Sequence, residues 1–195
     1  TLDSMREDKR LKIASETSYL YAPLAHRLGL YSIKTELEDL SFKFMNQDVY
    51  TDITSKLKKT KAVRERFIQK FCNPIKKELD NQGFKYIMKG RTKAVPSIQR
   101  KIKNKGVDFE EIFDVFAIRI IIDSSPENEK SDCWKAYSLV TDFYIPNPER
   151  LRDWISYPKQ NGYESLHTTV MSPTGKWVEV QIRSKRMDDV AEKGL

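Results

Sequence analysis

Lysine and arginine side chains recur between residues 89 and 101, where the sequence reads KGRTKAVPSIQRK. Cations at this density can form a solvated basic face, a nucleic-acid patch or a cradle for a polyphosphate, because they interact with both water and phosphate oxygens. The chain of 195 residues has 35 Lys+Arg against 28 Asp+Glu, and the resulting net charge of +7 favours a polyanionic partner. Composition and spacing leave all three interpretations open.

Glu179 stands in the stretch KWVEVQIR, whose residues alternate between apolar and polar. In a strand, Val178, Val180 and Ile182 would share one face, and Glu179 and Gln181 would share the other. A carboxylate on a rigid sheet can hold Mg²⁺ or accept a proton. The alternative is a solvent-facing side chain in a cross-strand ion pair.

Asp114 and Arg119 are the charged residues of the apolar stretch FDVFAIRIII. Charges in such a stretch must be paired or face a wet cavity, because desolvating an unpaired charge is costly. Structural pairing and a functional role both fit. Residues five apart point to opposite faces of a pleated strand, so the two serve one site only if Asp114 lies at an irregular strand edge.

The segment PKQNGYESLHTT groups residues that could contact a nucleotide around a glycine. Tyrosine can stack on a base, asparagine can bind a base edge, and lysine and histidine can touch phosphates. An ordinary loop with a half-buried tyrosine is the alternative. The candidates are Lys159, Asn161, Tyr163 and His167, and residues 150–153 can likewise be a charged strand entry.

The elements that must position these residues fall into two parts. Residues 4 to about 82 have helical spacing, with Gly29 ending the first helix and a third helical region from about 48 to 82 adjusted at Pro74. Strands are expected near 84–90, 113–122, 152–158, 165–172 and 176–183, with a covering helix whose N-cap is Ser125 and whose first residue is Pro126. The fold class is therefore α+β.

Several classes of protein are excluded or disfavoured by the composition. Two cysteines, Cys72 and Cys133, are too few for a disulfide framework, and His26 and His167 have no companion cysteines for zinc. No apolar run is long enough for a membrane span, and there is no signal peptide. We expect a cytoplasmic protein, and the missing initiator Met suggests a fragment of a longer one.

Taken together and in order, several stretches resemble the RelA/SpoT family of (p)ppGpp synthetases. They are YAPLAHRLGLYSIKTELEDLSF, GRTKAVPSIQRK, FEEIFDVFAIRIII, DCW, RLRDWISYPKQNGYESLHTTV and WVEVQIRS. The resemblance implies a nucleotidyltransferase-like mixed five-stranded sheet flanked by helices and preceded by an all-α segment. It also implies transfer of the β,γ-pyrophosphate of ATP to the 3′-OH of GTP or GDP, giving AMP and pppGpp or ppGpp. The basic stretch then becomes a polyphosphate cradle.

The same resemblance assigns roles residue by residue. Asp114 and Glu179 resemble the family's catalytic and Mg²⁺-binding carboxylates. The expected ATP-binding residues are Arg91 and Arg119, which would sandwich adenine, and Lys93, Ser97, Arg100 and Lys101 near the phosphates. The expected GTP- or GDP-binding residues are Arg150, Arg152, Lys159, Asn161, Tyr163, which would stack on guanine, His167 and Gln181.

The resemblance also predicts how the chain is divided and what it lacks. Residues 1–47 would be the last helices of a truncated hydrolase domain, and residues 48–195 the synthetase domain, with its sheet core at about 83–184. Because the hydrolase's metal motif is absent, we expect no (p)ppGpp hydrolysis. The full-length protein would act with the ribosome or with regulatory domains, and neither DNA nor a membrane is expected as a partner.

Residues 150–153 read Arg-Leu-Arg-Asp where long members of the family have Arg-x-Lys-Asp. A guanidinium replaces a compact ammonium, so the preference for GTP or GDP stays open. Two other functions remain as alternatives: a catalytically silent nucleotide- or RNA-binding module, and a nucleotidyltransferase that releases inorganic pyrophosphate.

Overall fold

The computed structural model describes residues 2–109 and 115–194. Its first part is helical: a short 3₁₀ turn at Leu2–Ser4, α1 (Glu7–Glu16), a π-helical turn at Thr17–Tyr21, α2 (Ala22–Arg27), α3 (Tyr31–Met45), α4 (Gln47–Lys59) and α5 (Lys61–Asn81). Gly29 adopts φ +74° just after α2, so the predicted stop is confirmed. The helical spacing is also confirmed, but Leu20, Leu24 and Leu28 lie on an exposed face.

The helical region predicted as one piece from 48 to 82 is two helices, and α5 continues through Pro74. The break lies at Thr60, whose hydroxyl donates to the carbonyl oxygen of Lys56 at 2.9 Å. Pro74 lies inside α5, which continues past it because Phe71, Ile75 and Leu79 are buried in the core on either side. Tertiary packing therefore outweighs the missing proline donor.

The sheet has five strands: β1 (Tyr86–Thr92), β2 (Phe116–Ile122), β3 (Arg152–Asp153), β4 (Leu166–Met171) and β5 (Trp177–Ser184). Their order is β1-β2-β5-β4-β3, with β2 and β5 parallel and the other pairs antiparallel. The predicted mixed five-stranded α+β fold is confirmed. β3 is much shorter than expected, because the Asp153 carboxylate accepts the backbone N–H groups of Ile155 and Ser156 and bends the chain into a turn.

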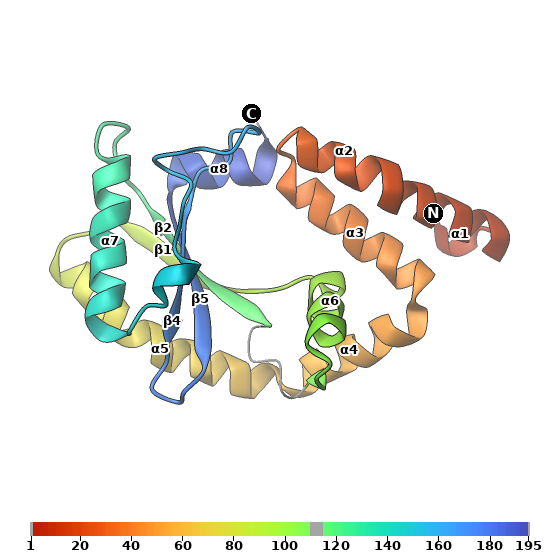
Figure 1. Cartoon of the computed structure of the whole chain (residues 1–195), viewed down its shortest axis with the longest axis horizontal. Coiled ribbons are helices and arrows are strands. Elements are labelled where there is room, and N and C mark those ends of the chain that lie inside the picture. The colour runs from red at the N-terminus through yellow and green to blue at the C-terminus, as the bar shows by residue number, and fades with distance from the viewer. Residues whose placement is uncertain (1, 110–114, 195) are drawn as a thin grey trace.

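Three further helices complete the fold: α6 (Val95–Lys105), α7 (Glu129–Phe143) and α8 (Lys185–Lys193). α7 begins later than predicted, because the carbonyl oxygen of Ser125 accepts the N–H groups of Asn128 and Glu129 in a preceding turn. α5 and α7 pack together and contact the strands on one side of the sheet (Figure 1). Within the described ranges, none of the helices is both long and apolar enough to cross a membrane.

The two faces of the sheet differ in character. The face toward α5 and α7 is apolar and carries Ile118, Ile120, Val178, Val180 and Ile182, all buried, as the alternation in β5 predicted. The opposite face is polar, and α8 lies against part of it while α3 contacts both α6 and α8 (Figure 1). The helical segment and the polar face of the sheet are therefore joined through α3.

Candidate functional site

Strand register collects the predicted residues on the polar face. Lys89, Arg119, Gln181 and His167 form one row across β1, β2, β5 and β4. Arg91, Ala117, Glu179 and Thr169 form the next row. Rows two residues apart in a pleated sheet share a face, so residues from four strands converge on one rigid surface.

Lys93 and Glu179 form the central contact of this surface. The Nζ atom of Lys93 lies 2.7 Å from Oε2 of Glu179, and Nε2 of Gln181 donates to Oε1 at 2.7 Å. Burial alone would raise the pKa of Glu179, but the adjacent ammonium and the amide hydrogen bond bring it down to about 2. Glu179 is therefore a fixed negative charge at neutral pH.

His167 extends the network from Glu179 to Tyr163. Its Nδ1 lies 3.6 Å from Oε1 of Glu179, and its Nε2 lies 2.8 Å from the hydroxyl of Tyr163. Burial lowers the pKa of His167 to about 4, because desolvation outweighs the attraction of the Glu179 carboxylate. The imidazole is therefore neutral at pH 7 and can donate or accept a hydrogen bond.

Tyr163 lies within an aromatic cluster and is only 8% exposed. Its ring meets Tyr31 of α3 edge-on at 4.9 Å and Trp154 at 5.8 Å, and Nζ of Lys159 lies 3.9 Å from the Trp154 ring centroid. Burial lowers the pKa of Lys159 and raises that of Tyr163. Neither Tyr31 nor Trp154 was among the predicted site residues.

Asn161 ties the loop between β3 and β4 to the helical segment. Its Nδ2 donates to the Tyr31 hydroxyl at 2.6 Å and to the backbone oxygen of His26 at 3.1 Å. The predicted acceptor-loop residues Lys159, Asn161 and Tyr163 thus lie together, next to the turn that joins α2 to α3. No local sequence signal reports such a contact between distant segments.

Arg119 lies on the same face but is only 3% exposed and held by α8. Its Nη1 contacts Asp188 at 3.3 Å and Glu192 at 2.8 Å, and both carboxylates also bind Arg183. Burial and the neighbouring Arg183 and Arg91 lower the pKa of Arg119. Its Nε and Nη2 atoms are buried without a hydrogen-bond partner in the described structure.

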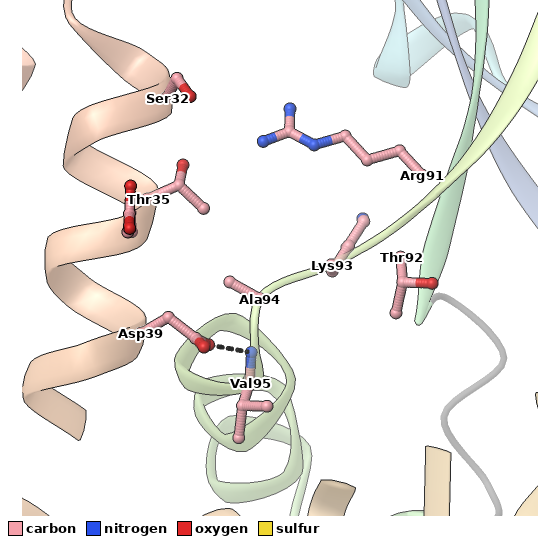
Figure 2. A pocket seen from close by; sticks show the side chains of 9 residues that line it. Ser32, Thr35, Asp39, Arg91, Thr92, Lys93, Ala94 and Val95 are labelled. Carbon is pink, nitrogen blue, oxygen red and sulfur yellow. Dashed lines mark hydrogen bonds between the residues drawn. The ribbon is translucent and has the colours of Figure 1, made fainter. Parts of the chain in front are cut away.

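The basic stretch at residues 89–101 runs from the end of β1 into the first part of α6. Arg91 and Lys93 line a cavity of about 380 Å³ whose other wall is α3, as Figure 2 shows. Ser97 and Lys101 follow one turn apart on α6. Arg100 instead lines a second cavity of about 310 Å³, between α6 and the other side of α3. Of the predicted phosphate-binding residues, Lys93 thus lines the first cavity and Arg100 the second.

One predicted residue stands apart from this cluster: Arg150 is exposed at the end of a 3₁₀ turn (Pro148–Arg150). Arg152 lies opposite His167 in the strand register and so continues the first row onto β3. It is exposed, and its guanidinium donates to the backbone oxygens of Glu149 and Leu151 at 2.8 and 2.9 Å. Asp114 lies outside the described residues. Within those residues, no group of three or more His, Cys, Asp or Glu side chains is arranged to hold a metal ion.

Comparison with solved structures places the fold among alarmone synthetases. The chain superimposes on the small alarmone synthetase 2 of Bacillus subtilis with a TM-score of 0.51 and 27% identity, covering 72% of this chain and 76% of that one. The family profile described as "Region found in RelA / SpoT proteins" matches residues 90–195. The chain belongs to the RelA/SpoT family.

Curated relatives align along the entire chain. A GTP pyrophosphokinase of Myxococcus xanthus is 45% identical over 195 residues, which are 100% of this chain and 25% of the relative. A guanosine-3′,5′-bis(diphosphate) 3′-pyrophosphohydrolase of Aquifex aeolicus is 41% identical over 196 residues, which are 100% of this chain and 27% of the relative. The chain thus spans about a quarter of the length of these relatives.

Proposed function

We propose that this chain is a (p)ppGpp synthetase, which transfers the β,γ-pyrophosphate of ATP to the 3′-OH of GTP or GDP. The observation that carries the proposal is the Lys93–Glu179 pair on the polar face of the sheet, between the basic stretch and the aromatic loop. At this junction, the Lys93 ammonium can bind the phosphates of one nucleotide, and the Glu179 carboxylate can interact with the hydroxyl of another. Membership of the RelA/SpoT family supports the same activity.

The donor side would be built from the basic stretch. Arg91 and Arg119 would hold adenine, and the unpartnered Nε and Nη2 atoms of Arg119 support a ligand there. Lys93, Ser97 and Lys101 would contact the phosphates. Arg100 would contact ATP only if the nucleotide reached the second cavity, so we assign it a secondary role.

The acceptor side would be built from the loop and β4. Tyr163 would stack on guanine, with Lys159, Asn161, His167 and Gln181 around the nucleotide. Because Tyr31 occupies one side of the Tyr163 ring, guanine would use the other side or displace Tyr31. The exposed guanidinium groups of Arg150 and Arg152 are available for the acceptor's 5′-phosphates, which is where GTP and GDP differ.

We further propose that Mg²⁺ binds at this face of the sheet, where Glu179 has the chemistry of a ligand. Magnesium is commonly held by one or two carboxylates together with substrate phosphates, and Glu179 provides one ionised carboxylate. Asp114, outside the described residues, would provide the second. When bound with ATP, the ion would neutralise charge that develops on the transferred phosphates.

ATP binding would separate Lys93 from Glu179. The ammonium would turn to the phosphates, and the carboxylate would then lose the partner that lowers its pKa. A Glu179 carboxylate that is freed from Lys93 and does not hold the metal ion could instead take the proton of the 3′-hydroxyl as its oxygen attacks the β-phosphorus. The bond from the β-phosphorus to the oxygen bridging it to the α-phosphorus breaks, and AMP leaves with that oxygen.

The test follows the transferred group directly. The purified chain is incubated with Mg²⁺, ATP labelled on the γ-phosphate and either GTP or GDP, and the nucleotides are separated by chromatography. We expect label in a guanosine penta- or tetraphosphate, and a loss of about 10²-fold or more in Glu179→Gln, since the carboxylate acts in the chemical step. Transfer by Glu179→Gln at the unsubstituted rate would refute the assigned role.

The same purified protein and labelled ATP distinguish two alternative functions. A nucleotidyltransferase would release inorganic pyrophosphate instead of labelling guanosine. A binding module would give no transfer, and its affinity for RNA would fall steeply with salt while being indifferent to Glu179→Gln. Incubation with labelled ppGpp tests our further proposal that the chain has no hydrolase activity.

A further inference from the structure

The helix α3 carries a polar stripe along one side. Ser32, Thr35, Glu36 and Asp39 have the i, i+3, i+4, i+7 spacing that places residues on one helix face. All four line the cavity whose opposite wall contains Arg91, and Figure 2 shows the Arg91 side chain reaching from β1 toward α3. A helix that ends forty residues before the first strand therefore forms one wall of this cavity.

Asp39 is the member of the stripe that touches the basic stretch. Its Oδ1 accepts the backbone N–H of Val95, the first residue of α6, at 3.2 Å (Figure 2). Its Oδ2 accepts the hydroxyl of Tyr50, from α4, at 2.9 Å. The carboxylate is thus fixed from two sides, by α4 and by α6.

The first turn of α6 has few other ways to satisfy its backbone donors. Ala94 occupies the N-cap and has no side chain that could accept a hydrogen bond. Pro96 has no N–H, and the N–H of Ser97 already donates to the oxygen of Ala94 at 3.0 Å. Val95 therefore presents the donor left over at this end, and Asp39 supplies the cap that the sequence of α6 lacks.

These backbone hydrogen bonds at the start of α6 limit how a phosphate could bind there. With the N–H groups of Val95 and Ser97 engaged, the N-terminus of α6 offers little backbone for a phosphate, and binding would depend on the side chains of Lys93, Ser97 and Lys101. Ser97 and Lys101 lie on α6, so their positions depend on how α6 packs against α3 and α4. The Asp39 contact is a hydrogen bond that holds the two helices in register.

We propose that Asp39 is a positioning residue of the donor-nucleotide site. By capping α6 from α3, it fixes the width of the cavity and the placement of Ser97 and Lys101 without touching the reacting atoms. The assignment rests on the proposed function, because it takes the cavity to be the ATP site. The carboxylate also opposes the positive end of the α6 dipole, which adds to the stability of the contact.

The experiment compares Asp39→Ala, Asp39→Asn and Tyr50→Phe in the purified chain. Asp39→Ala should raise KM for ATP about tenfold, because Ser97 and Lys101 would lose their placement, and leave KM for GTP within about twofold. Asp39→Asn keeps an acceptor oxygen and should recover most of the ATP affinity. Tyr50→Phe frees one carboxylate oxygen and should have an intermediate effect.

Controls separate positioning from general destabilisation. Lys34→Met lies on the same helix, breaks the i,i+4 pair with Glu38 and lines neither cavity, so KM for ATP should not change. Amide exchange of Val95 should accelerate in Asp39→Ala and stay slow in Lys34→Met. Unchanged KM for ATP in Asp39→Ala, a lower KM, or an equal rise for both substrates would overturn the proposal.

The two proposals fail in different ways. If the unsubstituted chain gives no transfer but binds ATP in a calorimeter, the catalytic proposal fails and the dissociation constant replaces KM in the comparison. If transfer proceeds and Asp39→Ala binds ATP normally, the proposed function stands and Asp39 is not a positioning residue. If the unsubstituted chain does not bind ATP at all, both proposals are wrong.

Discussion

Lys93 and Glu179 lie 86 positions apart in the chain and form the contact on which the proposed chemistry depends. Their side chains are 18% and 24% exposed, so each is largely removed from water and each compensates the other's charge. Breaking such a pair lowers the free energy of unfolding, because the remaining charge stays partly buried without its partner. The same pair also holds the pKa of Glu179 low until a phosphate competes for Lys93.

Removing the Lys93 ammonium should therefore destabilise the fold. Lys93→Met should lower the free energy of unfolding by about 2–3 kcal/mol, somewhat below the cost of breaking a fully buried pair. The double variant Lys93→Met/Glu179→Gln should lose less than the sum of the two single changes. Urea unfolding followed by circular dichroism measures all three.

Lys61→Met is the matched control, since Lys61 pairs with Glu65 on an exposed helix face. Exposed pairs contribute little, so its effect should stay within about 0.5 kcal/mol. Equal losses for Lys93→Met and Lys61→Met would show that the Lys93–Glu179 contact contributes no more than a surface pair.

At the scale of elements, α8 supports the polar face. Oδ1 of Asp188 accepts a hydrogen bond from Nε of Arg183 at 2.7 Å and lies 3.3 Å from Nη1 of Arg119. One short helix therefore neutralises two buried guanidinium groups. Ser184 caps α8 by accepting the N–H of Met187, and Met187 and Ala191 are buried beneath it. The helix is thus anchored by its cap, its apolar face and its carboxylates.

Asp188→Ala should destabilise the protein by about 3–5 kcal/mol, because Arg119 and Arg183 would remain buried with too little negative charge. It should also weaken ATP binding if Arg119 holds adenine. Asp189→Ala, which removes only the exposed pair with Lys193, is the control and should be nearly neutral. Thermal unfolding and ATP calorimetry test the two effects, and a neutral Asp188→Ala would exclude α8 as a support.

The strands could be predicted from the sequence, and α8 could not. The alternation in β5 and the apolar run of β2 have a strong period, so they predicted both the sheet and the face of Glu179. α8 buries only Met187 and Ala191 as apolar residues, too few for a helical pattern to stand out among its charges. Its Ser184 cap was the available signal.

The residues of the site could be predicted only where a local motif marks them. Local motifs identified Glu179, Tyr163 and His167 as candidates, but a sequence does not show which residues meet across the fold. Asp39, Tyr31 and Asp188 complete the site through side-chain contacts with residues more than fifty positions away, which are Val95, Asn161 and Arg119. Those partners are set by the docking of helices, which no short pattern encodes.

For the molecule as a whole, the helical segment and the loop between β3 and β4 are in direct contact. The turn joining α2 to α3 reaches the loop at Gly29, where an added Cβ would lie 2.8 Å from the backbone oxygen of Asn161. The other end of the chain meets the same turn, since a Cβ on Gly194 would lie 2.5 Å from Leu30. The helices and the predicted acceptor loop therefore form one packed unit.

Gly29→Ala tests whether this packing reaches the acceptor site. Gly83→Ala is its control: the two glycines have φ +74° and +75°, but nothing lies within 4 Å of a Cβ at Gly83. Both variants carry the strain of a left-handed alanine, about 1 kcal/mol. Only Gly29→Ala must also push the loop away from the α2–α3 turn.

We therefore expect the two variants to differ in the loop and not in the sheet. Hydrogen exchange of residues 157–163 should accelerate in Gly29→Ala and remain unchanged in Gly83→Ala, and KM for GTP should rise several-fold in the first variant alone, since Asn161 and Tyr163 would shift together. KM for ATP should stay constant, because the Asp39 contact lies in the middle of α3, about two turns beyond its first residue. Equal exchange in both variants would mean that the loop holds its position without the helical segment.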